Sequence, residues 1–256
     1  MTKRSNWSIP YFIFLVLFVI LPLVLVIVYA FQSNEGGFTF SNIGKFFSDS
    51  DAISTFALSL EVAIENTLIC ILLGYPAAYI LADKKLNRSA VTIVLFILPM
   101  WINALMRTLA TSELFNVLGF TLGKGTLLFG MVYDYLPFMI YPIYTILQKM
   151  DKSYGEAAED LGATPLQVFT KVTLPLSMPG IMSGVMMVFM PTVSTFAIAE
   201  FLTNNKIKLF GTIIQENINS SMWNYGSALA LIMLIIIGIT SLFSSEEDNA
   251  AEGGLI

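Results

Sequence analysis

The sequence predicts an all-α polytopic membrane protein with six transmembrane helices. Hydrophobic residues make up 56% of the chain and charged residues only 12%, about half the charged fraction of a soluble domain. The mean hydropathy of +0.76 agrees with this composition. Six apolar runs have the length that an α-helix needs to cross a ~30 Å hydrocarbon core. The predicted spans are about 9–31, 56–82, 90–109, 126–148, 180–201 and 225–243.

The first apolar run follows Lys3 and Arg4 and is longer than the ~7–15 apolar residues of a secretory signal. Val28-Tyr29-Ala30 is similar to a cleavage site, so a cleaved signal peptide is the alternative. The length favours a retained first span. Residues 32–55 are polar, and we expect them to form an external loop.

The basic residues predict how the spans are oriented. Lys84, Lys85 and Arg88 follow the second span, and such a cluster is expected to stay in the cytoplasm. Lys and Arg are more numerous on the faces that this orientation makes cytoplasmic. Both termini and the loop between the fourth and fifth spans are therefore predicted to be inside. We expect the fifth span to be broken at Pro191.

The loop of residues 151–179 is too polar for lipid but carries strong helix signals. Ser153 and Glu156 have the spacing of a capping box, and Gly162 supplies a left-handed stop. Thr164 and Gln167 form a second box, which predicts a second short helix. Its residues Leu166, Phe169 and Val172 share one face, and it is expected to end at Pro175 and Pro179.

These residues also carry a family resemblance. Glu156-Ala157-Ala158 is followed after three residues by Gly162, and after nine more by Val172 and Leu174-Pro175. This spacing resembles the EAA loop of ABC-importer membrane subunits, which usually have Ile in place of Val172. An ordinary amphipathic connector is the alternative. The resemblance implies the type I ABC importer permease fold and a loop that docks on an ATPase subunit. The coupling residues that it implies are Glu156, Ala157, Ala158, Leu161, Gly162, Leu166, Phe169 and Pro175.

Three further strings resemble the permease subunits of spermidine/putrescine-type ABC importers. They are LLGYPAAYILA at 72–82, PMWINALMRT at 99–108 and LPFMIYP at 136–142. The resemblance implies a subunit of the bacterial inner membrane that passes a polyamine from an external binding protein to the cytoplasm by alternating access. Its implied partners are two ATPase subunits and a second permease, expected to be a paralogue. A permease for another solute, an ion-coupled secondary transporter and a membrane-embedded enzyme are the alternatives.

Charged and aromatic residues within the spans are candidates for a substrate pathway. Four carboxylates fall in the outer half of the predicted bundle, against the single cation Arg107, so this region favours a cationic substrate. Aromatic rings next to the carboxylates offer cation–π contacts. The candidates are Glu61, Glu65, Trp101, Tyr133, Asp134, Tyr135 and Glu200. In the alternative reading, Glu65 or Asp134 pairs with Arg107 while Glu61 and Glu200 are hydrated at the membrane interface.

Several function classes are excluded by what the sequence lacks. There is no histidine for a triad, a His metal site or a His proton relay, and Cys70 is the single cysteine, so no intramolecular disulfide forms. No G-x-x-x-x-G-K-[ST] motif is present, so ATP has to be bound by a partner. We expect neither enzymatic activity nor a cofactor or metal in this chain.

The acidic residues of the C-terminal tail account for most of the formal net charge of −5. The rest of the chain is nearly neutral, which gives no electrostatic support for a nucleic-acid partner. The sequence therefore predicts one transmembrane domain over residues 1–245. The tail of residues 246–256 is acidic and rich in small residues, and it is expected to be disordered.

Overall fold

The computed structural model describes residues 9–33, 35–83 and 91–253, and the regular structure of these residues is helical apart from one isolated bridge between Gln32 and Phe38. Four helices are long and apolar enough to cross a membrane, and two bent helix pairs raise this number to six if each pair is one span. The basic residues Lys3, Arg4, Lys84, Lys85 and Arg88 lie outside the described residues.

The first half of the chain forms the elements α1 to α7 with two irregular helical turns. These are α1 (Ile9–Leu15), the π-helix η2 (Val16–Ile20), α2 (Leu21–Ala30), α3 (Ser41–Ser48), α4 (Ser50–Ala82), α5 (Val91–Ile97), the 3₁₀-helix η3 (Leu98–Trp101), α6 (Ala104–Val117) and α7 (Lys124–Lys149).

The second half contains the polar loop and the last spans. Its elements are α8 (Ser153–Asp160), α9 (Pro165–Val168), the π-helix η4 (Phe169–Thr173), α10 (Leu174–Leu176), α11 (Met178–Ser194), α12 (Ala197–Thr203), α13 (Phe210–Asn219) and α14 (Trp223–Gly253).

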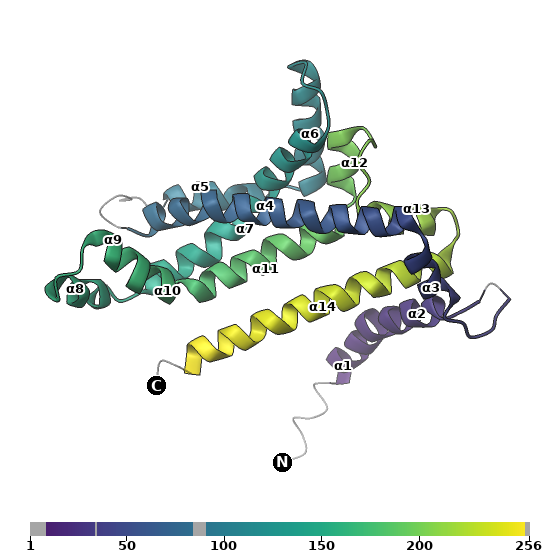
Figure 1. Ribbon diagram of the computed structural model, residues 1–256, viewed down its shortest axis with the longest axis horizontal. Helices are drawn as coiled ribbons and strands as arrows, with labels where there is room; N and C mark the ends of the chain where they lie inside the picture. Colours follow the sequence, from purple (N-terminus) through teal and green to yellow (C-terminus); the bar gives the residue numbers. More distant parts are fainter. Residues whose placement is uncertain (1–8, 34, 84–90, 254–256) are drawn as a thin grey trace, which may run out of the picture.

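Helices α4, α7 and α11 pack side by side and form the centre of the molecule (Figure 1). Cys70, Met139, Ile143 and Val188 lie in the apolar cluster between them. Gly184 allows α11 to approach α7 closely, because a Cβ at this position would lie 2.7 Å from the Met139 sulfur. Close approach through small residues is how helices pack in lipid, where the hydrophobic effect does not drive them together.

The remaining elements surround this centre. Helix α14 packs on α2, α13 and α11, while α6 and α12 project together from the side of the bundle (Figure 1). Helices α8 and α9 lie at one end of the bundle, and α3 and α13 lie at the other. Most side chains of α2 are apolar and exposed, as expected for a helix that faces lipid or another subunit.

The third predicted span, residues 90–109, is not one straight helix. Helices α5 and α6 are bent by 92° at η3, and α6 runs on to Val117. The bend follows Pro99, and Asn103 starts a new helix because its side-chain oxygen accepts hydrogen bonds from the backbone N–H groups of Leu105 and Met106.

The break in the fifth predicted span also lies elsewhere than expected. Pro191 lies inside α11, and the chain leaves the helix after Ser194. At this point the backbone of Gly211 comes so close that a Cβ there would lie 2.5 Å from the Ser194 carbonyl oxygen. The contact with the start of α13, rather than the proline, marks where the helix ends.

Two other boundaries differ from the sequence prediction. Helix α4 begins at Ser50 rather than near residue 56, because the Asp49 carboxylate accepts hydrogen bonds from the backbone N–H groups of Asp51 and Ala52. Helix α14 continues to Gly253, past residue 246, where the sequence analysis placed the start of the acidic tail. Ala and Glu are good helix formers, and they extend a helix that is already nucleated. Residues 254–256 lie outside the described part of the chain.

Candidate functional site

The polar loop, residues 151–179, projects from one end of the bundle as two short helices (Figure 1). The predicted Ser153–Glu156 capping box is wrong, since Ser153 is already the first residue of α8. The Asp151 carboxylate caps α8 instead and accepts a hydrogen bond of 3.0 Å from the Ser153 backbone N–H. The hydrogen bonds from Ser153 hold the pKa of the Asp151 carboxyl below its usual range.

The other local signals of the loop are confirmed. Gly162 ends α8 at a φ of 86°, and the backbone N–H of Ala163 donates to the Ala158 carbonyl. The side-chain oxygen of Gln167 accepts from the Thr164 N–H at 2.8 Å, and the Thr164 hydroxyl accepts from the Gln167 N–H at 3.4 Å. Because these bonds join near neighbours in the sequence, the motif alone was enough to predict them.

The second helix of the loop ends at Leu176, between Pro175 and Pro179, close to where it was expected to end. The π-turn η4 comes before Pro175, which then stands in the first turn of α10, where a missing N–H is tolerated. The chain bends by 60° between α10 and α11. Ser177, at the bend, is buried and shares a hydrogen bond of 2.9 Å with the Tyr75 hydroxyl of α4.

The structure separates the two residues that the sequence analysis placed on one docking face. The Phe169 ring packs edge-to-face against Tyr75 and Tyr79 of α4, with both centroid distances at 5.8 Å. Leu166 is 71% exposed and Leu161 is 90% exposed. Phe169 therefore anchors the loop to the bundle, while the two leucines remain free for an external contact.

Tyr154 adds a third apolar side chain to the exposed surface of the loop, and the sequence analysis missed it. Its position in the first turn of α8, two residues before Glu156, is the signal that could have identified it. Glu156 and Ala157 are exposed and Ala158 is half-buried. We define the docking surface as Tyr154, Glu156, Ala157, Leu161 and Leu166.

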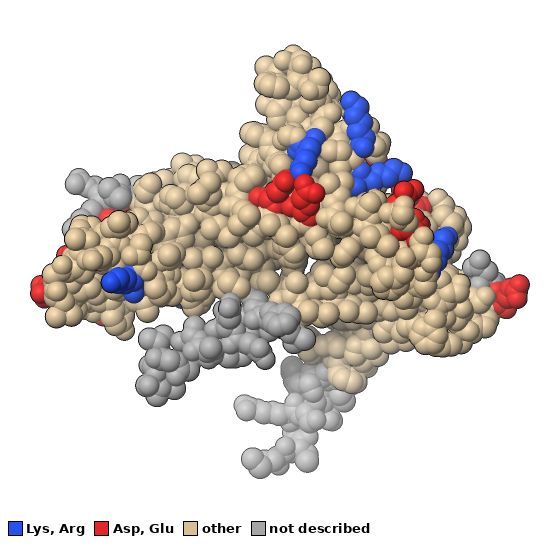
Figure 2. All heavy atoms as spheres, in the orientation of Figure 1, with Lys and Arg blue, Asp and Glu red and all other residues tan. Residues whose placement is uncertain are grey.

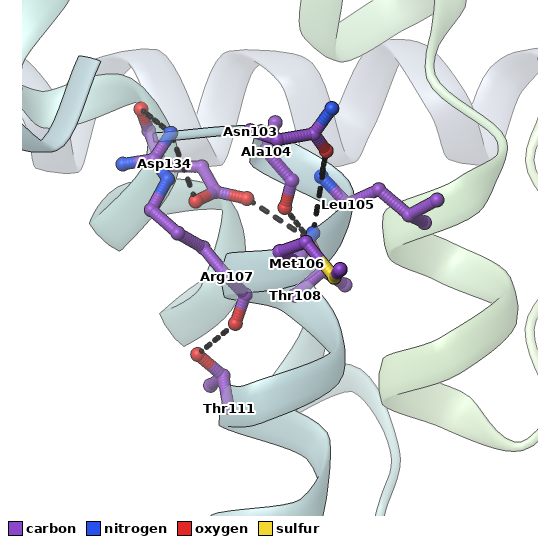
Figure 3. Close-up of polar contacts among 8 residues, drawn as sticks. All are labelled: Asn103, Ala104, Leu105, Met106, Arg107, Thr108, Thr111 and Asp134. Carbon is purple, nitrogen blue, oxygen red and sulfur yellow. Dashed lines mark hydrogen bonds and ion pairs between the residues drawn. The ribbon is translucent and has the colours of Figure 1, made fainter. Parts of the chain in front are cut away.

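The second candidate site is a buried polar cluster between α6 and α7 (Figure 3). The guanidinium of Arg107 lies 3.2 Å from Asp134 Oδ1, and the two side chains are only 5% and 2% exposed. The Thr108 hydroxyl lies 3.1 Å from Asp134 Oδ2, to which it can donate. The Tyr133 ring also lies near the guanidinium, with its centroid 5.5 Å from Arg107 Cζ. The alternative pairing of Asp134 with Arg107 is therefore the one observed.

Glu61 and Glu65 do not pair with Arg107. Both carboxylates of α4 reach Lys124 at the start of α7, at distances of 2.6 and 2.9 Å to its Nζ. The sequence analysis missed this lysine, because its partners lie about sixty residues earlier and are brought near it only by the packing of α4 on α7. The excess of carboxylates over cations in this half of the bundle is therefore smaller than predicted.

Within the part of the chain that the structure describes, none of the other three pathway candidates has a hydrogen bond or ion pair with Arg107 or Asp134. Trp101 is 87% exposed, and Glu200 is half-buried on α12. Tyr135 is also half-buried and packs between two apolar clusters of the bundle. Among the described residues, no group of three or more Cys, Asp or Glu side chains is arranged to hold a metal ion.

The fold defines the class of protein. The chain superposes on a chain of a bacterial ABC transporter involved in the import of the acidic polysaccharide alginate, with a TM-score of 0.66. The match has 16% sequence identity and covers 96% of this chain and 98% of the other. The protein has the type I ABC importer permease fold, as the EAA resemblance implied.

The sequence comparisons identify the family. Residues 3–245 match the model of the binding-protein-dependent transport system inner membrane component, and the chain belongs to this family. It is 32% identical to the Escherichia coli K12 spermidine/putrescine transport system permease protein PotB, over 89% of this chain and 91% of that protein. It is 31% identical to the Haemophilus influenzae PotB, over 89% and 88% of the two chains.

Proposed function

We propose that this chain is the membrane-spanning subunit of an ATP-driven importer that passes a polyamine, such as spermidine or putrescine, into the cytoplasm. The observation that carries the choice of substrate is the similarity to spermidine/putrescine permeases along 89% of the chain. The similarity includes the region of Asp134, a buried carboxylate of the kind that marks substrate and ion pathways in membrane proteins.

The docking surface is the part of this subunit that we assign to a pair of ATPase subunits. Its exposed leucines offer apolar contact, and Glu156 adds a charged group beside them. Phe169 and Ser177 connect the loop to α4, and α10 leads directly into α11. A pull on the loop would therefore be transmitted to two of the three central helices, which is what ATP-driven alternating access requires.

The remaining partners and the orientation follow from the same proposal. We assign the end with α8 and α9, together with both termini, to the cytoplasm, and the end with α3 and α13 to the outside. An external binding protein would deliver the polyamine to the outer end. A second permease, expected to be a paralogue, would complete the membrane pore. The proposed pathway residues are the carboxylates Glu61, Glu65, Asp134 and Glu200 and the aromatic residues Trp101, Tyr133 and Tyr135.

The test is the ATPase activity of the complete complex in lipid nanodiscs, with its binding protein, during titration with spermidine, putrescine and an anionic control such as glutamate. Stimulation by a polyamine but not by glutamate is the expected result. Stimulation by another solute alone would retain the importer mechanism and overturn the choice of substrate. If no ATPase co-purifies and uptake follows an ion gradient, the importer assignment is wrong.

A further inference from the structure

The buried guanidinium of Arg107 has too few partners. Its Nε and Nη1 atoms are buried and have no hydrogen-bond partner among the described residues, and Asp134 Oδ1 also lacks one with good geometry. Only Nη2 approaches the carboxylate. A well-formed Arg–carboxylate pair is bidentate, and a buried ion pair is stable only when its remaining hydrogen-bonding groups are satisfied. This pair is therefore poorly suited to be a permanent structural bond.

The pair lies near the middle of the membrane-spanning part of α7. Asp134 is ten residues after the start of α7, or ~15 Å along the helix, which is about half of a ~30 Å hydrocarbon core. Arg107 is on the first turn of α6, directly after the 92° bend at η3. Figure 3 shows the two side chains meeting between these elements. Arg107 thus belongs to α6, which projects from the bundle, and Asp134 belongs to α7 at the centre of the bundle.

The groups around Asp134 suit a second kind of cation. A primary ammonium is a compact donor of three hydrogen bonds and could bond Oδ1, while the Thr108 hydroxyl keeps its bond to Oδ2. The Tyr133 ring, which now lies against the guanidinium, could equally accept an alkylammonium by a cation–π contact. Exchange of one cation for another would leave the Asp134 carboxylate with a counter-ion throughout.

We infer that Arg107 is a displaceable counter-ion, which holds the Asp134 carboxylate in the absence of substrate and gives it up to a primary ammonium group of the polyamine. The inference rests on the proposed function. Release of Arg107 removes two polar links between α6 and α7, the ion pair and the contact of Nη2 with the Asp134 carbonyl, while the Thr108 hydrogen bond remains. Arrival of substrate would in this way loosen the bent helix beside the pathway.

The experiment compares four forms of the complete complex in nanodiscs and liposomes, with binding protein: wild type, Asp134→Asn, Arg107→Gln and the double variant. Loss of the carboxylate removes a charge-assisted hydrogen bond to substrate, so uptake of radiolabelled spermidine should fall about tenfold in Asp134→Asn. The double variant has no buried charge left unpaired, and co-purification with the ATPase checks its assembly. Its spermidine uptake should remain as low as that of Asp134→Asn. A structural ion pair predicts the opposite, namely that the double variant recovers uptake, and that result would overturn the inference.

A second measurement remains informative if Arg107→Gln is unstable. Spermidine should raise the thermal midpoint of Arg107→Gln more than that of wild type, since its ammonium replaces the missing guanidinium. It should not raise the midpoint of the double variant, which lacks the carboxylate. If spermidine raised the thermal midpoints of Arg107→Gln and of the double variant equally, the inference would be overturned. The matched control is Lys208→Gln/Glu216→Gln, which removes an exposed ion pair of 2.7 Å and should leave uptake near that of wild type.

The response of the wild-type complex distinguishes a failure of the proposed function from a failure of the inference about the ion pair. If it shows no polyamine-stimulated ATPase activity, the proposed function fails whatever the variants do. If it responds to spermidine and the double variant transports normally, the proposed function stands, and the roles given to Arg107 and Asp134 fail.

Discussion

Two sets of charged residues are paired between different helices. Lys124 contacts both Glu61 and Glu65, and Arg107 contacts Asp134. The two sites differ in their surroundings. The Lys124 side chain is 40% exposed, whereas the side chains of the Arg107–Asp134 pair are almost fully buried. Exposed pairs contribute little to stability, so the buried pair is the one at which a lost charge should matter.

At the residue scale, Gly162 is the position where a small change should weaken coupling to the ATPase while the subunit still folds and assembles. Its φ of 86° lies in the left-handed region, which costs an L-residue about 1–2 kcal/mol. Gly162→Ala should therefore tilt α8 relative to α9 and weaken spermidine-stimulated ATPase activity in the assembled complex. Since a Cβ at Gly162 meets no atom within 4 Å, the effect should come from the backbone and not from a clash.

The matched control is Gly155→Ala in the same loop. Gly155 is helical, and its Cβ would make only an ordinary contact of 3.6 Å with Val168, so this change should leave coupling intact. Equal ATPase stimulation in the two variants would contradict the role given to the angle between α8 and α9.

At the scale of elements, the short run α9–η4–α10 has an inner and an outer side. Phe169 contacts α4, and Leu166 is exposed one turn earlier. The π-turn η4 inserts an extra residue before Pro175, which changes the phase of the helix relative to a regular α-helix. Leu166 precedes this turn, and a spacing of three residues leaves it about 60° from Phe169 around the helix, so Phe169 can pack on α4 while Leu166 stays exposed.

This arrangement predicts that two truncations on one helix will have different effects. Phe169→Ala should lower the stability of the subunit by about 2 kcal/mol, because a half-buried ring loses its contacts with two tyrosines. Leu166→Ala should leave the thermal midpoint unchanged but reduce co-purification of the ATPase subunits. Thermal unfolding in detergent and pull-down from membranes measure the two effects. A loss of stability in Leu166→Ala, or normal stability in Phe169→Ala, would contradict the assignment of the two sides.

At the scale of the whole molecule, the two ends of the bundle carry different structures. The end with α8 and α9 displays the docking surface, and the end with α3 and α13 is built of short helices between spans (Figure 1). On the face drawn in Figure 2, a few charged side chains lie at the end with α8 and α9, and the others are spread from the middle of the view to the opposite end. The tan area between these two groups carries no charged side chain on this face, as expected for a surface in hydrocarbon.

The proposed orientation can be tested with single cysteines in a Cys70→Ala background, since Cys70 is the single cysteine of the chain and is buried. A cysteine at Glu159 on α8 should react with a membrane-impermeant maleimide only after the cells are opened. A cysteine at Ser220, just after α13, should react in intact cells that have a permeable outer barrier. Both side chains are exposed in the structure. Labelling of both positions from the same side would contradict the opposite placement of the two ends.

The sequence alone determined the fold class and two local signals of the polar loop, the stop at Gly162 and the Thr164–Gln167 box. These features depend on composition and on residues within a few positions of each other. The tertiary structure decided the partners of Asp134, Glu61 and Glu65 and the inward direction of Phe169. Those features depend on which helices pack together, and contacts across tens of residues leave no periodic signal in a single sequence.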